Sequence, residues 1–152
     1  LTGGNLFDDV LAFERQSGER ILYDGEHWTA FVPQAARWPF EVQMFPKRGI
    51  SRLPELSAPE KLEFATMYLS ILQALDRVLG DEMPYIAAWH QAPVHAQDDD
   101  SRLFLEVFSL RRAAGKLKYL AGSESAAGVW INDISPEAAA QALREELKQV
   151  SA

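Results

Sequence analysis

The sequence contains no cysteine, and it is short of basic residues. Without cysteine there can be no disulfide, thiolate metal site or cysteine nucleophile, and the composition fits a cytoplasmic protein. Lysine and arginine number 15 against 22 acidic residues, which gives a formal net charge of −7. Because nucleic-acid binding needs an excess of cations to neutralise phosphates, this balance disfavours a general nucleic-acid partner.

Long apolar runs and targeting signals are also missing. No apolar run approaches the roughly 18 residues of a membrane span, and no signal peptide or lipidation motif is visible. We therefore expect no membrane association. The chain starts at Leu1 rather than Met, so we expect further residues upstream. Its 152 residues fit one domain, residues 1–152, which is long enough to bury a core without disulfides or metals.

Three segments show helical patterns. The first is NLFDDVLAFERQSG, with Asn5 as N-cap and its final glycine as the stop. The second opens with a capping box of Ser57 and Glu60 and ends at Gly80. Helical spacing predicts that this helix buries an apolar seam of Leu62, Ala65, Leu69, Leu72 and Leu75, widened by Phe64, Met67, Tyr68, Ile71 and Val78. The third follows Ser135 as N-cap and closes the chain.

Six segments have the composition of short strands, and most are joined directly. They are RILYD, HWTAFVP, FEVQMFPK, PYIAAWH, RLFLEVFSL and KLKYLAGSE. The dipeptide at residues 24–25, Asp-Gly, is typical of a hairpin turn, and YIAA has the composition of a buried strand. Strands linked in series, with one long helix inserted and another at the end, indicate an α+β fold with a mainly antiparallel sheet.

The sequence has three histidines, and no two are spaced as a metal-binding pair on one helix or strand. We expect His27 to be a turn residue and His95 to lie in a polar loop. That loop ends in the acidic run at residues 98–100, which we expect to be solvated, with metal binding as the alternative. His90, in WHQAP, lies between a strand and a loop and is either a packed histidine or a ligand.

Glu106 is the carboxylate in the strand pattern LFLEVFSL. Strand alternation places it on the same face as Phe104 and Phe108, opposite Leu105 and Val107. An unpaired buried carboxylate is costly. Glu106 therefore either has a partner or a function, or it lies in water at a sheet edge.

Four cations gather within this acidic chain, at Arg111, Arg112, Lys116 and Lys118. Lys116 and Lys118 fall on one face of the strand expected at KLKYLAGSE. A phosphorylated ligand is one explanation of the cluster. A solvated edge strand protected by lysine is the other.

Four longer segments carry more specific information: EHWTAFVPQAARWPFEVQMFPKR, PYIAAWHQAP, GKLKYLAGSE and NDISPEAAAQALR. In this order and spacing they resemble the C-terminal half of galactose-1-phosphate uridylyltransferase, a family of the histidine triad superfamily. The resemblance runs from Glu26 to Arg144, and WPFE and KLKYLAGSE are its more specific parts. It implies a histidine-triad-like α+β unit whose mainly antiparallel sheet carries a long helix and a C-terminal helix.

The resemblance implies a nucleotidyltransferase of galactose metabolism. In the family, a histidine of a His-Pro-His segment takes UMP from UDP-glucose and passes it to galactose 1-phosphate, a covalent transfer in two steps. That segment belongs to the family's N-terminal half, and no His-Pro-His occurs in this sequence. We therefore expect a C-terminal domain or subunit without a catalytic residue of its own. Its partners would be an N-terminal uridylyltransferase half, UDP-hexose and hexose 1-phosphate, in a homo- or heterodimer.

The resemblance also implies a structural zinc or iron site. The family's WHQAP histidine corresponds to His90, and a His-x-His or His-x-Glu pair on the next strand corresponds to Phe104 and Glu106. A further carboxylate comes from the N-terminal half. Because a phenyl ring cannot ligate a metal, only His90 and Glu106 remain, and two ligands rarely close a site. We therefore expect a degenerate site, with zinc or iron absent or weakly bound.

The family's contacts with the hexose phosphate correspond to Lys118, Tyr119, Ser123 and Glu124. Lys118 would pair with a phosphate oxygen, and Glu124 would accept hydrogen bonds from sugar hydroxyls. Serine stands at position 123, where the family often has an aromatic hydroxyl, and Trp130 stands near the position of a substrate glutamine. On one continuous strand, Lys118 and Glu124 would lie roughly 20 Å apart, too far for an ion pair unless the chain bends at Gly122.

Two other functions compete with the transferase. A degenerate histidine-triad-like scaffold or dimerisation module without a ligand would account for the loss of a metal-binding histidine at position 104, where phenylalanine stands. The retained Lys118 and Glu124 instead favour the transferase. A stand-alone nucleotide hydrolase of the same superfamily is disfavoured, because no His-x-His-x-His run occurs. A His-Pro-His segment upstream, or in a neighbouring reading frame, would decide in favour of the transferase.

Overall fold

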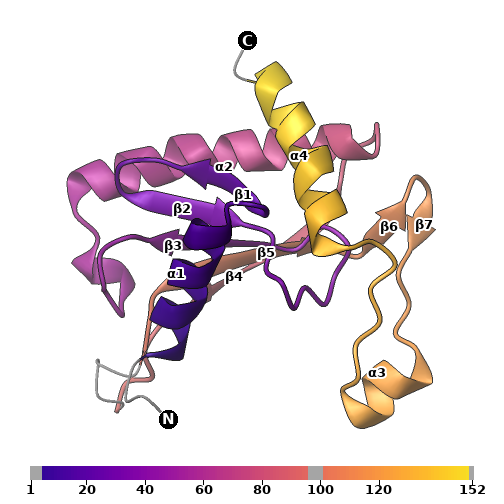
Figure 1. Cartoon of the computed structure of the whole chain (residues 1–152), viewed down its shortest axis with the longest axis horizontal. Coiled ribbons are helices and arrows are strands. Elements are labelled where there is room, and N and C mark those ends of the chain that lie inside the picture. The colour runs from indigo at the N-terminus through magenta and orange to yellow at the C-terminus, as the bar shows by residue number, and fades with distance from the viewer. Residues whose placement is uncertain (1–4, 96–100, 151–152) are drawn as a thin grey trace.

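The structure, a computed structural model, describes residues 5–95 and 101–150, so the acidic run at 98–100 lies outside it. A five-stranded antiparallel sheet has the strand order β1-β2-β3-β5-β4. Its strands are β1 (Ile21–Asp24), β2 (Trp28–Phe31), β3 (Val42–Pro46), β4 (Tyr85–His90) and β5 (Phe104–Ser109). The predicted α+β fold is confirmed (Figure 1). Within the described ranges, no helix has both the length and the apolar character of a membrane span.

Helices cover both faces of the sheet (Figure 1). These are α1 (Leu6–Ser17) on one face and α2 (Ala58–Val78) and α4 (Pro136–Val150) on the other. A short α3 (Gly122–Ala127) lies away from the sheet, and a 3₁₀ turn spans Leu53–Glu55. Strand alternation separates two apolar clusters. Met44 and Leu105 point into the main core with α2 and α4, whereas their neighbours Phe45 and Phe104 pack with Leu11 of α1.

Side-chain caps fix the predicted helix starts. Asn5 accepts a hydrogen bond from the backbone at the start of α1, and Gly18 ends that helix in the left-handed conformation, with φ at 70°. The predicted capping box of α2 is confirmed, since Glu60 accepts from the Ser57 backbone N–H at 2.7 Å. At α4, the Ser135 hydroxyl accepts a hydrogen bond from the first turn at 3.2 Å. Each cap joins residues two or three positions apart, so the helix starts can be predicted from the sequence alone.

The predicted seam of α2 is partly wrong. Met67, Ile71 and Leu75 are buried, but Leu62 and Leu69 keep 72% and 57% of their surface exposed. The buried stripe recurs every four residues from Met67 and faces the sheet and α4. Apolar residues occur on several sides of this helix, so packing against the sheet, rather than its own pattern, decides which side is buried.

Glu60 makes the stability of the fold sensitive to acid. Two hydrogen bonds from Arg48, at 2.9 and 2.8 Å, outweigh burial and lower the pKa of the Glu60 carboxyl to about 2. Because this pKa lies below the ordinary 4.5, the ionised carboxylate stabilises the fold above about pH 4.5, and the contribution is lost as the pH falls toward 2. We expect Glu60→Gln to lower the free energy of unfolding near neutral pH by about 0.5–2 kcal/mol, the scale of a helix cap, and to flatten its decline in acid.

Urea unfolding at a series of pH values measures this effect. Glu145→Gln, at an exposed position of α4, serves as the control and is expected to leave the acid dependence of the free energy unchanged. An acid decline in Glu60→Gln as steep as in the unaltered chain would contradict the prediction.

β4 is an edge strand, so the expectation of a buried strand at YIAA is wrong. It pairs with β5 and, in the part of the chain that the structure describes, with no other strand. Tyr85 and Ile86 therefore remain 46% and 45% exposed. Composition does not reveal whether an apolar strand has one neighbour or two.

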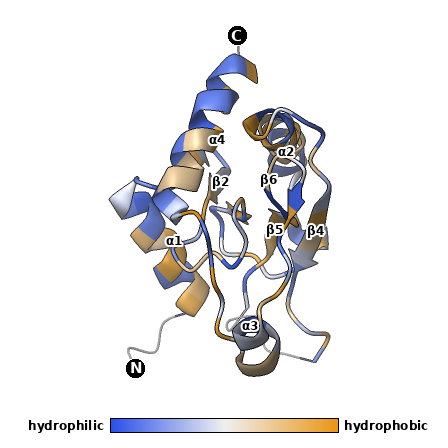
Figure 2. Cartoon of the chain, turned by 90° about the vertical axis from the view of Figure 1, so that its right-hand side faces the viewer, coloured by the Kyte–Doolittle hydropathy of each residue, from blue (hydrophilic) through white to orange (hydrophobic). Residues whose placement is uncertain are grey.

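Residues 111–134, which we call the arm, project from the sheet, and α3 lies at the far tip of this projection (Figure 1, Figure 2). The arm begins with the hairpin of β6 (Arg111–Ala113) and β7 (Lys116–Leu117). The strand predicted through KLKYLAGSE is thus wrong beyond β7, because the chain turns into α3. Of the two predicted arrangements of Lys118 and Glu124, the one with a bend at Gly122 is therefore confirmed, since α3 begins there. Lys118 Nζ lies 2.9 Å from Glu124 Oε1, as a bend near Gly122 allows.

Candidate functional site

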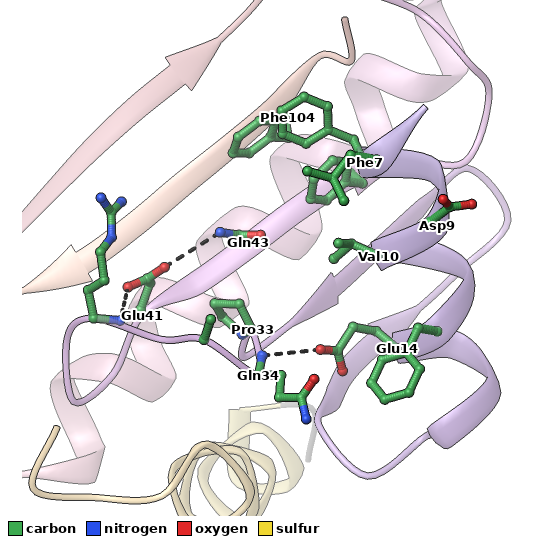
Figure 3. A pocket seen from close by; sticks show the side chains of 14 residues that line it. Phe7, Asp9, Val10, Glu14, Pro33, Gln34, Glu41, Gln43 and Phe104 are labelled. Carbon is green, nitrogen blue, oxygen red and sulfur yellow. Dashed lines mark hydrogen bonds between the residues drawn. The ribbon is translucent and has the colours of Figure 1, made fainter. Parts of the chain in front are cut away.

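A cavity of about 520 Å³ lies between α1 and the sheet (Figure 3). Phe7 and Val10 of α1 and Phe104 of β5 form apolar parts of its wall. Arg37 and Glu41, just before β3, line it as well and give it a polar part. These two residues also belong to a cluster of buried polar side chains around Glu106, described next.

Glu106 is the centre of this cluster. β5 lies between β3 and β4, so Glu106 is only 4% exposed and the alternative of a solvated edge is wrong. Its Oε1 accepts a hydrogen bond from Arg37 Nη2 at 2.9 Å, and its Oε2 lies 3.1 Å from His90 Nε2. Burial pushes the pKa of Glu106 upward, but hydrogen bonds from Arg37, Glu41 and His90 outweigh it and lower the pKa. The alternative in which this carboxylate has a partner is confirmed.

Glu41, the glutamate of the WPFE motif, is a second buried carboxyl beside Glu106, and sequence reasoning did not identify it as a site residue. Its Oε2 accepts a hydrogen bond from the Arg37 backbone N–H at 2.8 Å, and its Oε1 lies 3.5 Å from Gln43 Nε2 (Figure 3). Burial, opposed by the Arg37 backbone and assisted by the nearby charge of Glu106, raises the pKa of Glu41 to about 7. Glu41 therefore holds a proton near neutral pH much more readily than Glu106 does.

His90 ends β4 with its ring stacked on Phe104, at a centroid distance of 4.3 Å and an interplanar angle of 8°. An ionised carboxylate has no proton to give, so Nε2 of His90 is the donor in its hydrogen bond to Glu106. A nitrogen that carries a proton has no lone pair for a metal. In this arrangement His90 packs against an aromatic ring and supports a carboxylate.

The donor set at His90 and Glu106 does not fit zinc or iron. A structural site needs about four ligands, and Phe104 contributes a phenyl ring where the resemblance requires one of them. Within residues 5–95 and 101–150, no three or more His, Cys, Asp or Glu side chains are grouped so that they could hold a metal. Glu106 also has a counterion already, the Arg37 guanidinium.

The other two histidines lie apart from this cluster. His27 lies in the turn between β1 and β2, where its backbone N–H donates to Glu63 at 2.9 Å, in agreement with the predicted turn. The hairpin there closes with a hydrogen bond from Gly25 N to Trp28 O at 3.0 Å. His95 is exposed in the loop after β4, as predicted.

Lys118 and Glu124 form a closed unit in the arm. Lys118 Nζ donates to Glu124 Oε1 at 2.9 Å and to the carbonyl oxygens of Arg37 and Ile131, both at 2.6 Å. An ammonium has three hydrogens, so all of them are used. Glu124 accepts from the backbone N–H groups of Ala121 and Ile131, and these bonds, after that from Lys118, lower its pKa to about 2. The two side chains are only 6% and 1% exposed.

Aromatic side chains surround the Lys118 ammonium. Its nitrogen lies 5.0 Å from the ring centroid of Trp38 and 5.6 Å from that of Trp130, within the range of cation–π attraction. Trp130, which stands near the position where the resemblance implies a substrate glutamine, thus contributes a ring beside Lys118. By contrast, Tyr119 and Ser123 are exposed, Tyr119 to 82%. The four predicted substrate residues therefore divide into two buried side chains and two accessible ones.

Most of the clustered cations are neutralised within the chain. Arg111 pairs with Asp81, Arg112 with Asp133 and Lys118 with Glu124. Lys116 is exposed, and no ion pair joins it to another described residue. The cluster is therefore a series of separate ion pairs, which leaves little unbalanced positive charge for a phosphorylated ligand.

Arg37 connects the polar cluster with the arm, and sequence reasoning missed it. Its guanidinium pairs with Glu106, its backbone N–H donates to Glu41, and its carbonyl accepts from Lys118. The only signal was its position directly before the specific motif WPFE. A residue in a loop reveals such partners only after distant segments have been brought together.

Known proteins share both sequence and fold with this chain. Residues 2–152 match the family model described as the C-terminal domain of galactose-1-phosphate uridyl transferase. A galactose-1-phosphate uridylyltransferase from Streptomyces lividans is 40% identical over 153 residues, which cover 94% of this chain and 43% of that protein. A second, from Thermotoga maritima, is 38% identical and covers 87% of this chain and 42% of the relative. The chain thus spans less than half the length of the curated relatives it matches.

Solved structures agree with these relatives. A uridylyltransferase structure superposes with a TM-score of 0.90 at 34% identity, covering 99% of this chain and 48% of that one. A zinc-bound histidine triad family protein from Mycobacterium smegmatis superposes with a TM-score of 0.62 at 18% identity, which shows the fold alone. The predicted histidine-triad-like fold is therefore confirmed. The chain belongs to the galactose-1-phosphate uridylyltransferase family, as its C-terminal domain.

Proposed function

We propose that this domain takes part in UMP transfer between UDP-hexose and hexose 1-phosphate, together with an N-terminal uridylyltransferase half that carries the nucleophilic histidine. The observation that carries the proposal is the family match over residues 2–152, which corresponds to less than half of a relative such as the one from Streptomyces lividans. Because this sequence contains no His-Pro-His, the domain contributes binding and support rather than the nucleophile.

The arm is the part of this domain that we assign to the hexose phosphate. Tyr119 and Ser123 present exposed hydroxyls that can exchange hydrogen bonds with a sugar or a phosphate. Lys118 and Glu124 bond to each other, to backbone groups of the arm and, through Lys118, to the Arg37 carbonyl, and so hold the segment between them in one shape. In this division of roles, Tyr119 and Ser123 touch the substrate, and the ion pair positions them.

Exposed apolar side chains on the arm support the proposed assembly with further protein. Leu120, Val129 and Ile131 remain 47%, 59% and 50% exposed, and hydrophobic stretches run along the arm in Figure 2. Apolar surface gathered on a projecting segment is typical of a surface that another chain or domain covers. We propose that the N-terminal half or a second subunit covers it, in a homo- or heterodimer. The cytoplasmic location expected from the sequence stays a prediction.

The scaffold alternative rests on a specific observation. All three ammonium hydrogens of Lys118 and both carboxylate oxygens of Glu124 are already bonded within the chain. A module that only supports another domain would have this arrangement too. The two functions differ in whether the arm contributes to sugar-phosphate binding.

A transfer assay with radiolabelled UMP separates these functions. We expect no transfer by the 152-residue chain alone and transfer above the buffer blank after addition of an N-terminal half. In the assembled protein, Tyr119→Phe and Ser123→Ala should each weaken hexose 1-phosphate binding by about 0.5–1.5 kcal/mol, the net value of one hydrogen bond. UMP transfer by the chain alone would contradict the claim that this domain lacks the nucleophilic histidine. Unchanged binding in both variants would favour the scaffold.

A further inference from the structure

We infer that the guanidinium of Arg37 takes the place of a metal ion beside Glu106, and that Arg37 ties the arm to the sheet through this contact. This contact belongs to the architecture of the domain and does not depend on sugar-phosphate binding by the arm. A carboxylate that is 4% exposed needs a positive counterion, and Arg37 Nη2 at 2.9 Å is the contact that supplies one.

The surroundings of Glu106 disfavour a second cation. Its Oε2 is engaged by the Nε2–H of His90, whose ring is stacked on Phe104. A metal at this oxygen would have to displace that proton and would lie close to the guanidinium on the other oxygen. Two positive charges on the two oxygens of one carboxylate repel each other, and solvent around the 45% exposed Arg37 side chain reduces this repulsion without removing it. Phe104 offers no ligand that would offset this cost.

The same residue reaches the arm by two routes. The Arg37 carbonyl accepts from Lys118 Nζ at 2.6 Å, and its guanidinium carbon lies 5.4 Å from the ring centroid of Trp130. Asn132 strengthens the junction, since its side-chain amide donates to the carbonyls of Ala36 and Trp38 on either side of Arg37, both at 3.2 Å. The Arg37 guanidinium thus neutralises the Glu106 carboxylate on β5, while the backbone carbonyls of residues 36–38 accept hydrogen bonds from the arm.

Two independent measurements follow for Arg37. First, the dialysed chain should retain substoichiometric zinc by elemental analysis, and its thermal unfolding temperature should not change with EDTA. Second, Arg37→Gln should speed backbone hydrogen exchange across residues 116–131 by about tenfold or more, which corresponds to roughly 1.4 kcal/mol of local opening. Arg112→Gln, which removes an exposed ion pair with Asp133 inside the arm, is the matched control and should leave this exchange unchanged.

A gain of metal binding tests the replacement directly. Phe104→His supplies the missing ligand, so calorimetric titration with zinc alone should show weak binding in this variant. Addition of Arg37→Gln to Phe104→His should tighten zinc binding by roughly 10–100-fold, the scale of outer-shell effects on metal affinity.

Three results would overturn the inference. The first is one zinc ion per unaltered chain together with a lower unfolding temperature in EDTA. The second is an unchanged rate of backbone hydrogen exchange across residues 116–131 in Arg37→Gln. The third is an equal zinc affinity in Phe104→His with and without the Arg37→Gln substitution. The first two do not require the Phe104→His variants to fold.

Discussion

Replacement of Lys118 by methionine is expected to slow UMP transfer by the assembled enzyme about 100-fold, because a displacement of only about 1 Å in a substrate-positioning segment can cost this much. Methionine keeps the unbranched, flexible shape of the side chain, one heavy atom shorter, but removes all three hydrogen bonds to Glu124, Arg37 and Ile131. It also leaves the Glu124 carboxylate, which is only 1% exposed, without its counterion. The arm would then lose its fixed position on the sheet.

The kinetic pattern distinguishes positioning from direct contact with the phosphate. If Lys118 positions the arm, kcat falls and hydrogen exchange across residues 118–131 increases in the variant. If Lys118 instead binds the phosphate, as the resemblance to the family implies, the KM for hexose 1-phosphate rises while the exchange stays unchanged. Lys116→Met, an exposed neighbour on the same hairpin, is the control and should keep both kinetic constants. The second pattern would contradict the positioning role.

Features of the fold that depend on neighbouring residues could be predicted from the sequence. The caps of α1 and α2 are hydrogen bonds between residues two or three positions apart, at Asn5 and at Ser57 with Glu60. Strand alternation correctly placed Phe104 and Leu105 on opposite faces of β5, because side chains alternate in every extended strand. Such signals are independent of the tertiary environment.

The errors concern choices that tertiary contacts make. In α2 the sequence offered apolar residues on several sides, and the sheet and α4 selected the stripe with Met67 and Ile71 over the one with Leu62. In KLKYLAGSE, strand composition suggested an extended segment. The contacts of Lys118 with the Arg37 carbonyl and with Glu124 instead fix a bend there, and Arg37 is 81 positions distant. No periodicity within the segment encodes that contact.

The candidate site shows the same limit. Sequence reasoning identified His90 and Glu106 and the absence of a ligand at Phe104, since each belongs to a recognisable motif. It could not pair Glu106 with Arg37, which is 69 positions away in a loop. A carboxylate predicted to be buried implies a polar or charged partner. The identity of that partner depends on which loop residues the fold places beside β5, here Arg37 from the loop before β3.

A further cluster of charged side chains holds α1 beside the cavity, and its loss should have the largest effect on stability. Arg20 donates to Glu14 Oε2 at 3.0 Å and to Glu137 Oε1 at 2.7 Å, and so joins α1 to α4. Glu14 also accepts from the backbone N–H of Gln34 at the cavity (Figure 3). The side chains of Arg20 and Glu14 are 4% and 1% exposed. Neither charge can be released to water without opening the structure.

Arg20→Met is therefore expected to lower the free energy of unfolding by about 3–5 kcal/mol, the usual consequence of leaving one member of a buried ion pair unpaired. Urea denaturation measures this loss. Glu14→Gln added to Arg20→Met should recover part of it, because the double variant no longer buries a lone carboxylate. Arg15→Met, in an ion pair whose side chains are 45% and 41% exposed, is the control and should cost less than about 1 kcal/mol. If Arg20→Met were no more destabilising than Arg15→Met, or if the double variant recovered nothing, the buried charge of Glu14 would not explain how α1 is held against the sheet.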